Sequence, residues 1–212
     1  MVRLLGLCRY DELYKIEKPS NKILIMPTWR HELSNADKKQ FKESEYFKTY
    51  SHLLKSERLN SILEKYDYEV LFYPHMELQK FIDCFEGTDR VKIVHFSDST
   101  VQSLLINSDV LITDFSSVFF DYAYMGKPML FYQFDEESFR KNHYSEGYFN
   151  YSRDAFGDVV KTEDSLLSEL NNILANGAAV EDKYMDRINA FFTLRDKNNS
   201  KRNFDAIEEI VK

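Results

Sequence analysis

The sequence predicts an α/β protein, a Rossmann-like doubly wound parallel sheet with C-terminal helices. Short apolar, β-branched segments alternate with helix-like segments over the first 160 residues, and this alternation is typical of parallel sheets built from β–α–β units. The strand-like segments are apolar almost throughout, as expected where helices cover both faces of a sheet. After residue 160 the chain reads as helices alone.

Apolar runs bounded by turn residues predict the strands, and helical spacing of apolar residues predicts the helices. The expected strands are 22–27, 68–74, 90–96, 109–113 and 128–134. The expected helices are 44–66, 76–85, 100–108, 116–126, 162–176, 180–192 and 200–212. Residues 1–21 read as a linker or flexible arm, which leaves 22–212 as one Rossmann-like domain.

Composition excludes several classes of protein. The chain is 43% hydrophobic and 30% charged, which is typical of a globular domain. No apolar run approaches the roughly 20 residues that span a bilayer, and the first residues do not resemble a secretory signal. Cys8 and Cys84 form neither a disulfide framework nor a zinc site, and a reducing compartment follows. The net charge of −7 argues against broad nucleic-acid binding but not against a small anionic ligand.

An acid and two serines interrupt the apolar sequence between residues 109 and 126. Asp114, Ser116 and Ser117 stand between a predicted strand and the next helix. In open parallel sheets such turns border the ligand site, and the N–H groups and dipole of a helix N-terminus favour a phosphate. Ordinary helix capping by Ser116 or Ser117 explains the same residues. The chain contains neither a G-x-G-x-x-G dinucleotide fingerprint nor a P-loop.

Polar residues follow three other predicted strands and are expected at the same edge of the sheet. His75 suits proton transfer to or from a hydroxyl, although a capping or packing role fits equally well. Arg30 would either grip a phosphate or be solvated. Ser97 would contact a base or sugar, or belong to a plain turn.

Three segments together resemble the CDP-glycerol glycerophosphotransferase family, whose members build teichoic acids and related polymers. They are "ILIMPTWR" (23–30), "LFYPH" (71–75) and "SDVLITDFSSVFFDYAYMGKPMLFYQFD" (108–135). The segment 5–14 is similar to the family's G-x-P-R-x-D segment, with Cys8 in place of proline. The segment 196–207 is similar to its closing motif, with Asn198 where glycine is usual. The resemblance covers nearly the whole chain.

The resemblance implies a glycosyltransferase-type (GT-B) fold of two domains, with the active site between them. The chain corresponds to the second, nucleotide-donor-binding domain, with 1–21 as the interdomain linker. It lacks the first domain, which supplies the acceptor face and a second catalytic histidine. We therefore interpret the chain as a fragment or a truncated member, inactive by itself.

The resemblance also assigns roles to particular residues. His75 matches the catalytic histidine, although the usual arginine two residues earlier is Tyr73 here. Asp114, Ser116 and Ser117 match the donor-binding turn, with Phe115 replacing the common tyrosine. The other donor-binding residues that we expect are Arg30, Ser97, Asp121 and Arg202. Within this set Asp114 is expected to organise the loop, and Asp121 to hold Ser117 from one helical turn away.

The implied reaction transfers glycerol phosphate from CDP-glycerol to a polymer or lipid-linked acceptor with release of CMP. It needs no further cofactor, and the sequence leaves any metal requirement open. His75 would act either as acid on the departing phosphate or as base on the acceptor. Two alternatives remain: another GT-B transferase that uses CDP-ribitol or a sugar nucleotide, and a nucleotide-binding module without activity. The full-length protein is expected in the cytoplasm, peripheral at the inner face of the membrane.

Overall fold

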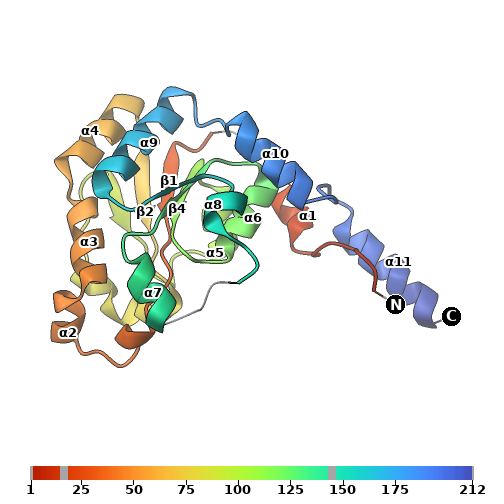
Figure 1. Cartoon of the computed structure of the whole chain (residues 1–212), viewed down its shortest axis with the longest axis horizontal. Coiled ribbons are helices and arrows are strands. Elements are labelled where there is room, and N and C mark those ends of the chain that lie inside the picture. The colour runs from red at the N-terminus through yellow and green to blue at the C-terminus, as the bar shows by residue number, and fades with distance from the viewer. Residues whose placement is uncertain (1, 15–18, 143–146, 212) are drawn as a thin grey trace.

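Parallel strands form one six-stranded sheet in the computed structural model, which describes residues 2–14, 19–142 and 147–211 (Figure 1). The strands are β1 (Lys22–Ile25), β2 (Glu69–Phe72), β3 (Val91–Ile93), β4 (Val110–Thr113), β5 (Met129–Tyr132) and β6 (Asp158–Val160). Their order is β3-β2-β1-β4-β5-β6, and Ile25 pairs with Phe72 on one side and Ile112 on the other. The order reverses between β1 and β4, which is where open α/β sheets bind ligands.

The predicted α/β class is confirmed, and each of the five expected strands is present, one to four residues shorter than its predicted range. Strand β6 was not expected, because "DVV" is too short to show a pattern in the sequence. It adds to the edge of the sheet beside β5, where Phe131 pairs with Val159.

Helices cover both faces of the sheet and connect its strands. They are α1 (Tyr10–Leu13), α2 (Lys38–Glu43), α3 (Glu45–Leu54), α4 (Glu57–Tyr66), α5 (Val101–Ile106), α6 (Val118–Met125), α7 (Glu136–Asn142), α8 (Tyr151–Asp154), α9 (Glu163–Ala175), α10 (Asp182–Phe191) and α11 (Asn199–Val211), with two 3₁₀ helices, η1 (His31–Leu33) and η2 (Met76–Cys84). Helices α3, α4 and α9 lie together on one side of the sheet, and α5 and α6 lie on the other (Figure 1).

Two expected helices differ from the prediction for local reasons. The segment 44–66 divides into α3 and α4 because the Ser56 hydroxyl caps a new helix by accepting from the N–H of Leu59. The segment 76–85 forms the tighter helix η2 in place of an α-helix. Its cap is His75, whose imidazole accepts from the N–H of Glu77.

Successive residues of the central strand β1 enter two separate cores. Ile23 and Ile25 pack with α3, α4 and α9, whereas Leu24 packs with α5 and α6. All three side chains are fully buried, as required of a strand covered on both faces. None of the described helices is long and apolar enough to cross a membrane.

Part of the predicted arm 1–21 packs against the domain. Tyr10 and Leu13 are buried and join Tyr124 of α6 in a third small core. Helix α11 extends away from the sheet (Figure 1), and Arg3 of the first segment pairs with Glu209 of α11. Residues 15–18 of the predicted linker lie outside the described residues, and the assignment of 1–21 as a link between two domains stays a prediction.

Candidate functional site

The turn after β4 is held from inside by Asp114, which is completely buried. One carboxylate oxygen accepts from the backbone N–H groups of Thr28 and Phe115, at 2.8 and 2.6 Å. The other accepts from the Arg30 guanidinium at 2.9 Å. Asp114 therefore joins the exit of β1 to the start of the turn.

Arg30 lies in the interior rather than at the surface, with its side chain only 2% exposed. It makes five hydrogen bonds, to the carboxylates of Asp114 and Asp135 and to the carbonyls of Thr28 and Trp29. A guanidinium has five N–H donors, so none remains for a ligand. This differs from both sequence-based expectations, a phosphate contact and a solvated side chain. The reason is that two buried carboxylates require a cation beside them.

A pocket of about 400 Å³ opens at the carboxyl ends of β1, β2 and β4, at the switch point of the sheet. Its polar lining comes from the first segment, the exit of β2, and the helices α5 and α6. The remaining wall is apolar. The lining residues are Arg9, Leu13, Met26, His75, Val101, Gln102, Leu105, Ser116, Ser117, Val118 and Asp121.

The N-terminus of α6 faces this pocket without a side-chain cap. Ser117 occupies the cap position in a helical conformation and makes no capping hydrogen bond. The Ser116 hydroxyl approaches the N–H of Val118 only at the limit of 3.5 Å. Within the described residues no group accepts from the backbone N–H of Ser116 or Ser117. Ser117 thus leaves the ordinary capping role unfilled, and two open backbone donors just before α6 border the pocket.

His75 lines the same pocket and is half-buried. Its Nδ1 accepts from the backbone N–H of Glu77 at 3.3 Å, and its ring stacks on Trp29 with the two centroids 6.2 Å apart. Burial lowers the pKa of His75 below its ordinary value, so the imidazole is neutral at pH 7. With Nδ1 used as an acceptor, the proton of the neutral ring is on Nε2.

Asp121 pairs with Arg9, not with Ser117 as expected. Its two carboxylate oxygens accept from Nε and Nη2 of Arg9 at 2.6 and 3.2 Å. A two-pronged bond to a guanidinium is stronger than one to a neutral hydroxyl, which explains the choice. Arg9 is the pocket residue that our sequence reasoning missed. Its signal was present in the segment 5–14, which we matched without assigning a role to the arginine.

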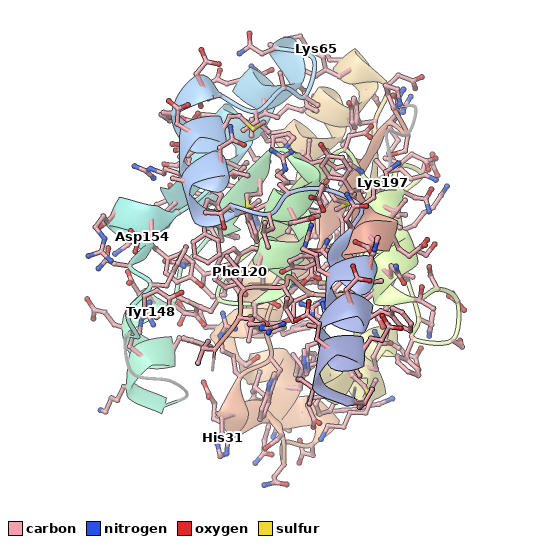
Figure 2. The ribbon with its side chains drawn as sticks, turned by 90° about the vertical axis from the view of Figure 1, so that its right-hand side faces the viewer. His31, Lys65, Phe120, Tyr148, Asp154 and Lys197 are labelled. Carbon is pink, nitrogen blue, oxygen red and sulfur yellow. The ribbon has the colours of Figure 1, made fainter. Side chains whose placement is uncertain are left out.

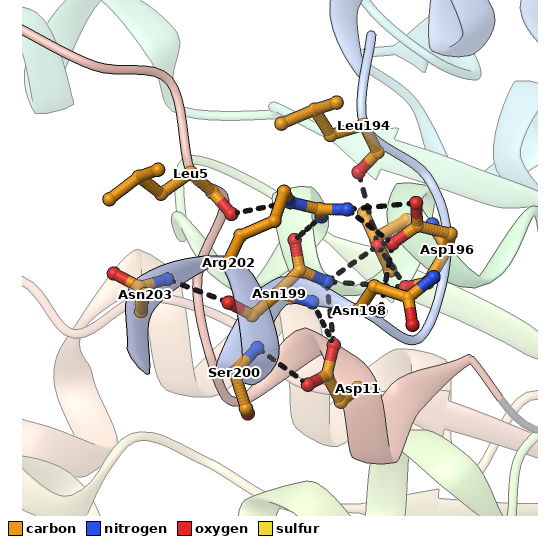
Figure 3. A network of polar contacts seen from close by, with 10 residues as sticks. Leu5, Asp11, Leu194, Asp196, Asn198, Asn199, Ser200, Arg202 and Asn203 are labelled. Carbon is orange, nitrogen blue, oxygen red and sulfur yellow. Dashed lines mark hydrogen bonds and ion pairs between the residues drawn. The ribbon is translucent and has the colours of Figure 1, made fainter. Parts of the chain in front are cut away.

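Arg202 and Ser97 do not line the pocket. Arg202 bonds the Asp196 carboxylate and the Leu5 carbonyl, in a network that ties the first segment to the start of α11 (Figure 3). Ser97 is exposed in the turn after β3, where its hydroxyl donates to Asp98. The structure therefore brings together His75, Ser116, Ser117 and Asp121 of the expected residues. It places Asp114 and Arg30 behind them, and Arg202 and Ser97 apart.

Comparisons with known proteins agree on one family. A family model described as CDP-glycerol:poly(glycerophosphate) glycerophosphotransferase matches residues 8–209. The chain is 38% identical to the minor teichoic acid biosynthesis protein GgaB of Bacillus subtilis, over 97% of this chain and 23% of that protein. It is 28% identical to a teichoic acid poly(glycerol phosphate) polymerase of Staphylococcus epidermidis, over 82% of this chain and 22% of that protein.

The fold is similar to that of a solved wall teichoic acid polymerase, TagF. The TM-score is 0.63 at 25% identity, over 95% of this chain and 47% of that chain. The chain thus spans about a quarter of the length of these curated relatives and about half of the solved chain.

The buried cluster predicts a large loss of stability when its cation is removed. Arg30→Ala leaves the carboxylates of Asp114 and Asp135 buried without their partner, and we expect the free energy of unfolding to fall by about 3–5 kcal/mol. Arg58→Ala is the matched control, because Arg58 pairs with Asp164 at the surface. A surface ion pair of this kind contributes less than about 1 kcal/mol to the free energy of unfolding. Urea denaturation measures both variants, and equal losses would contradict this account of the cluster.

The lowered pKa of His75 predicts a pH dependence of stability. Since its folded pKa lies below the ordinary value of 6.5, the unfolded chain takes up the proton first as the pH falls. The contribution of His75 to the stability of the fold is therefore complete above pH 6.5 and is lost as the pH falls below that value. Thermal unfolding from about pH 8 to about pH 5 should show wild type losing stability relative to His75→Gln in that range. Parallel curves would refute the expectation.

Proposed function

The chain belongs to the CDP-glycerol:poly(glycerophosphate) glycerophosphotransferase family, and we propose that it is the domain of such a transferase that binds the CDP-alcohol donor. The observation that carries the proposal is the uncapped N-terminus of α6, which opens into a pocket beside His75 at the switch point of the sheet. A phosphate group matches the unused donors there.

We assign the donor's pyrophosphate to the N–H groups and hydroxyls of Ser116 and Ser117. Asp114 does not oppose this placement, because its carboxylate is turned into the protein and satisfied by Thr28, Phe115 and Arg30. An aspartate facing a pyrophosphate would repel it. The apolar wall formed by Leu13, Met26 and Leu105 is suited to the uncharged part of the donor.

For His75 we propose the role of a hydrogen-bond donor. The sequence leaves acid and base roles open, but a neutral ring that accepts through Nδ1 from Glu77 presents an Nε2–H group. Such a ring stabilises charge on a phosphate oxygen and cannot take a proton at Nε2. The base for the acceptor hydroxyl then belongs to the first domain.

The proposed reaction is a phosphoryl transfer. An acceptor hydroxyl oxygen forms a bond to the β-phosphorus of CDP-glycerol while the bond to the bridging oxygen breaks, and CMP departs with that oxygen. The hydroxyl proton passes to the base outside this chain. The chain's own contribution is alignment of the donor and stabilisation of the departing charge by preorganised donors.

The second wall of the active site is proposed to come from a domain outside this chain, since the curated relatives are about four times longer. An exposed apolar stripe on α11, formed by Phe204, Ile207 and Ile210, gives that domain a surface to contact. In the side view of Figure 2, α11 stands in front of the domain, with Lys197 at its start. We place the full-length enzyme in the cytoplasm at the inner face of the membrane, where a lipid-linked acceptor is reached.

This proposal predicts that the purified 212-residue chain transfers no glycerol phosphate to a polymer acceptor, because the acceptor face and the base are proposed to come from a domain outside it. Release of CMP from CDP-glycerol, measured with and without acceptor, checks the expectation. Sustained transfer by the chain alone would contradict both the missing wall and the proposed role of His75.

The donor assignment is tested by calorimetric titration with CDP-glycerol, CDP-ribitol, CMP, UDP-glucose and ADP. We expect cytidine nucleotides to bind in preference to the others, and the glycerol and ribitol compounds to identify the alcohol. Equal or tighter binding of ADP or UDP-glucose would overturn the proposal.

The same titrations with Ser117→Ala locate the phosphates. Loss of one or two donor contacts to a charged group should weaken CDP-glycerol by about 1–2 kcal/mol. Cytidine, which has no phosphate, should bind as before. If cytidine is weakened while CDP-glycerol is not, the serines do not hold the phosphates.

A further inference from the structure

Arg9 is the one permanently charged cation among the described residues that line the pocket. It comes from the segment before α1, far in sequence from Ser116 and Ser117, and it reaches the pocket across the first turn of α6. The other arginines near this part of the fold are occupied: Arg30 is buried among carboxylates, and Arg202 bonds Asp196.

The pairing of Arg9 with Asp121 uses only one edge of the guanidinium. Nε and Nη2 donate to the two carboxylate oxygens. The guanidinium also contacts the Tyr10 side chain, with its central carbon 5.1 Å from the ring centroid. Within the described residues Nη1 makes no hydrogen bond to a carboxylate or a carbonyl. The Arg9 side chain is 57% exposed and that of Asp121 is 13% exposed. The carboxylate therefore orients the guanidinium from the α6 side, and the Nη1 edge is left for a ligand. That edge carries donors in the fork geometry that suits two phosphate oxygens.

The backbone that carries Arg9 is fixed from two directions. Tyr10 stacks on Tyr124 of α6 with their centroids 4.2 Å apart. The Asp11 carboxylate accepts from the backbone N–H groups of Asn199 and Ser200, at 2.8 Å each, at the start of α11 (Figure 3). A guanidinium held by its neighbours loses less conformational freedom when it binds a ligand, which favours affinity.

Charge balance in the pocket also requires a cation for an anionic donor. His75 is neutral, and the charges of Arg9 and Asp121 balance one another. A pyrophosphate is multiply anionic, and the serine N–H groups and hydroxyls supply dipoles rather than full charge. Arg9 is the group placed to supply that charge without a rearrangement of the core.

We propose that Arg9 binds the pyrophosphate of the donor through its free edge and that Asp121 is the positioning residue that orients it. This inference rests on the proposed function and adds to it a residue from outside the Rossmann-like core. The alternative is an ordinary surface ion pair without a ligand role, of the kind that contributes little to stability. The two differ in one respect: if Arg9 binds the pyrophosphate, removing Arg9 weakens only ligands that carry phosphates.

The experiment titrates the 212-residue chain with CDP-glycerol, CMP and cytidine, comparing wild type with Arg9→Ala, Arg9→Lys and Arg58→Ala. For Arg9→Ala we expect about a ten- to hundredfold loss of affinity for CDP-glycerol, a smaller loss for CMP and none for cytidine. Arg9→Lys should fall between wild type and alanine, because an ammonium keeps the charge without the fork. Arg58→Ala removes a similarly exposed arginine from an Arg–Asp pair away from the pocket and should bind as wild type does.

A wild-type chain that binds CDP-glycerol, together with an Arg9→Ala chain that binds it equally well, overturns the inference and leaves the proposed function intact. A wild-type chain that binds no cytidine nucleotide overturns the proposed function, and the inference with it. If Arg9→Ala weakens cytidine as much as CDP-glycerol, Arg9 shapes the pocket and does not hold phosphate. Should Arg9→Ala fail to fold, the comparison of Arg9→Lys with wild type decides in the same way.

The role of Asp121 is read from Asp121→Asn and Asp121→Glu in the same titrations. Asp121→Asn should lose part of the affinity for CDP-glycerol but none for cytidine, and Asp121→Glu should restore part of that loss. Unchanged or tighter binding of CDP-glycerol by Asp121→Asn would show that the carboxylate competes with the ligand and does not position Arg9.

Discussion

The buried ion cluster of Arg30, Asp114 and Asp135 is the interaction on which the rest of the structure depends. Its side chains are at most 7% exposed, and they stand at the exits of β1, β4 and β5. Charges removed from water are tolerated only when they are paired and their hydrogen bonds are complete. Arg30 meets that condition with five bonds. The cluster thereby locks three strand ends in one arrangement, and the turn 114–117 has a single position relative to β1.

The same cluster accounts for the open N-terminus of α6. Asp114 precedes this helix and would be an obvious cap, but its oxygens are committed to Thr28, Phe115 and Arg30. Ser117 takes a helical conformation and does not cap either. The backbone N–H groups of Ser116 and Ser117, just before α6, therefore have no acceptor among the described residues. The acid and the two serines are adjacent in the sequence but differ in role: Asp114 holds the turn from inside, and Ser116 and Ser117 line the pocket.

Contacts between the two ends of the described chain fix the segment that brings Arg9 to the pocket. The carboxylate of Asp11 holds the start of α11, and the guanidinium of Arg202 bonds both the carboxylate of Asp196 and the carbonyl of Leu5. These contacts position α1, and α1 positions Arg9. An exposed apolar stripe on α11 lies at this same end, so hydrogen bonds connect the helix that carries the stripe to the segment that carries Arg9.

The sequence by itself determined the class of fold, five of the six strands, the family resemblance and the edge of the sheet where His75, Ser116 and Ser117 meet. These are carried by local patterns: apolar runs, their alternation with helices, and turn residues at strand ends. Only the tertiary structure decided the partners of the charged groups. Arg30 became a buried counter-ion, Asp121 bonded Arg9, and Arg202 tied the chain ends together. The pairs Arg30–Asp114 and Arg9–Asp121 join residues more than 80 positions apart. Their choice depends on burial and on competing partners in three dimensions, neither of which a local pattern contains.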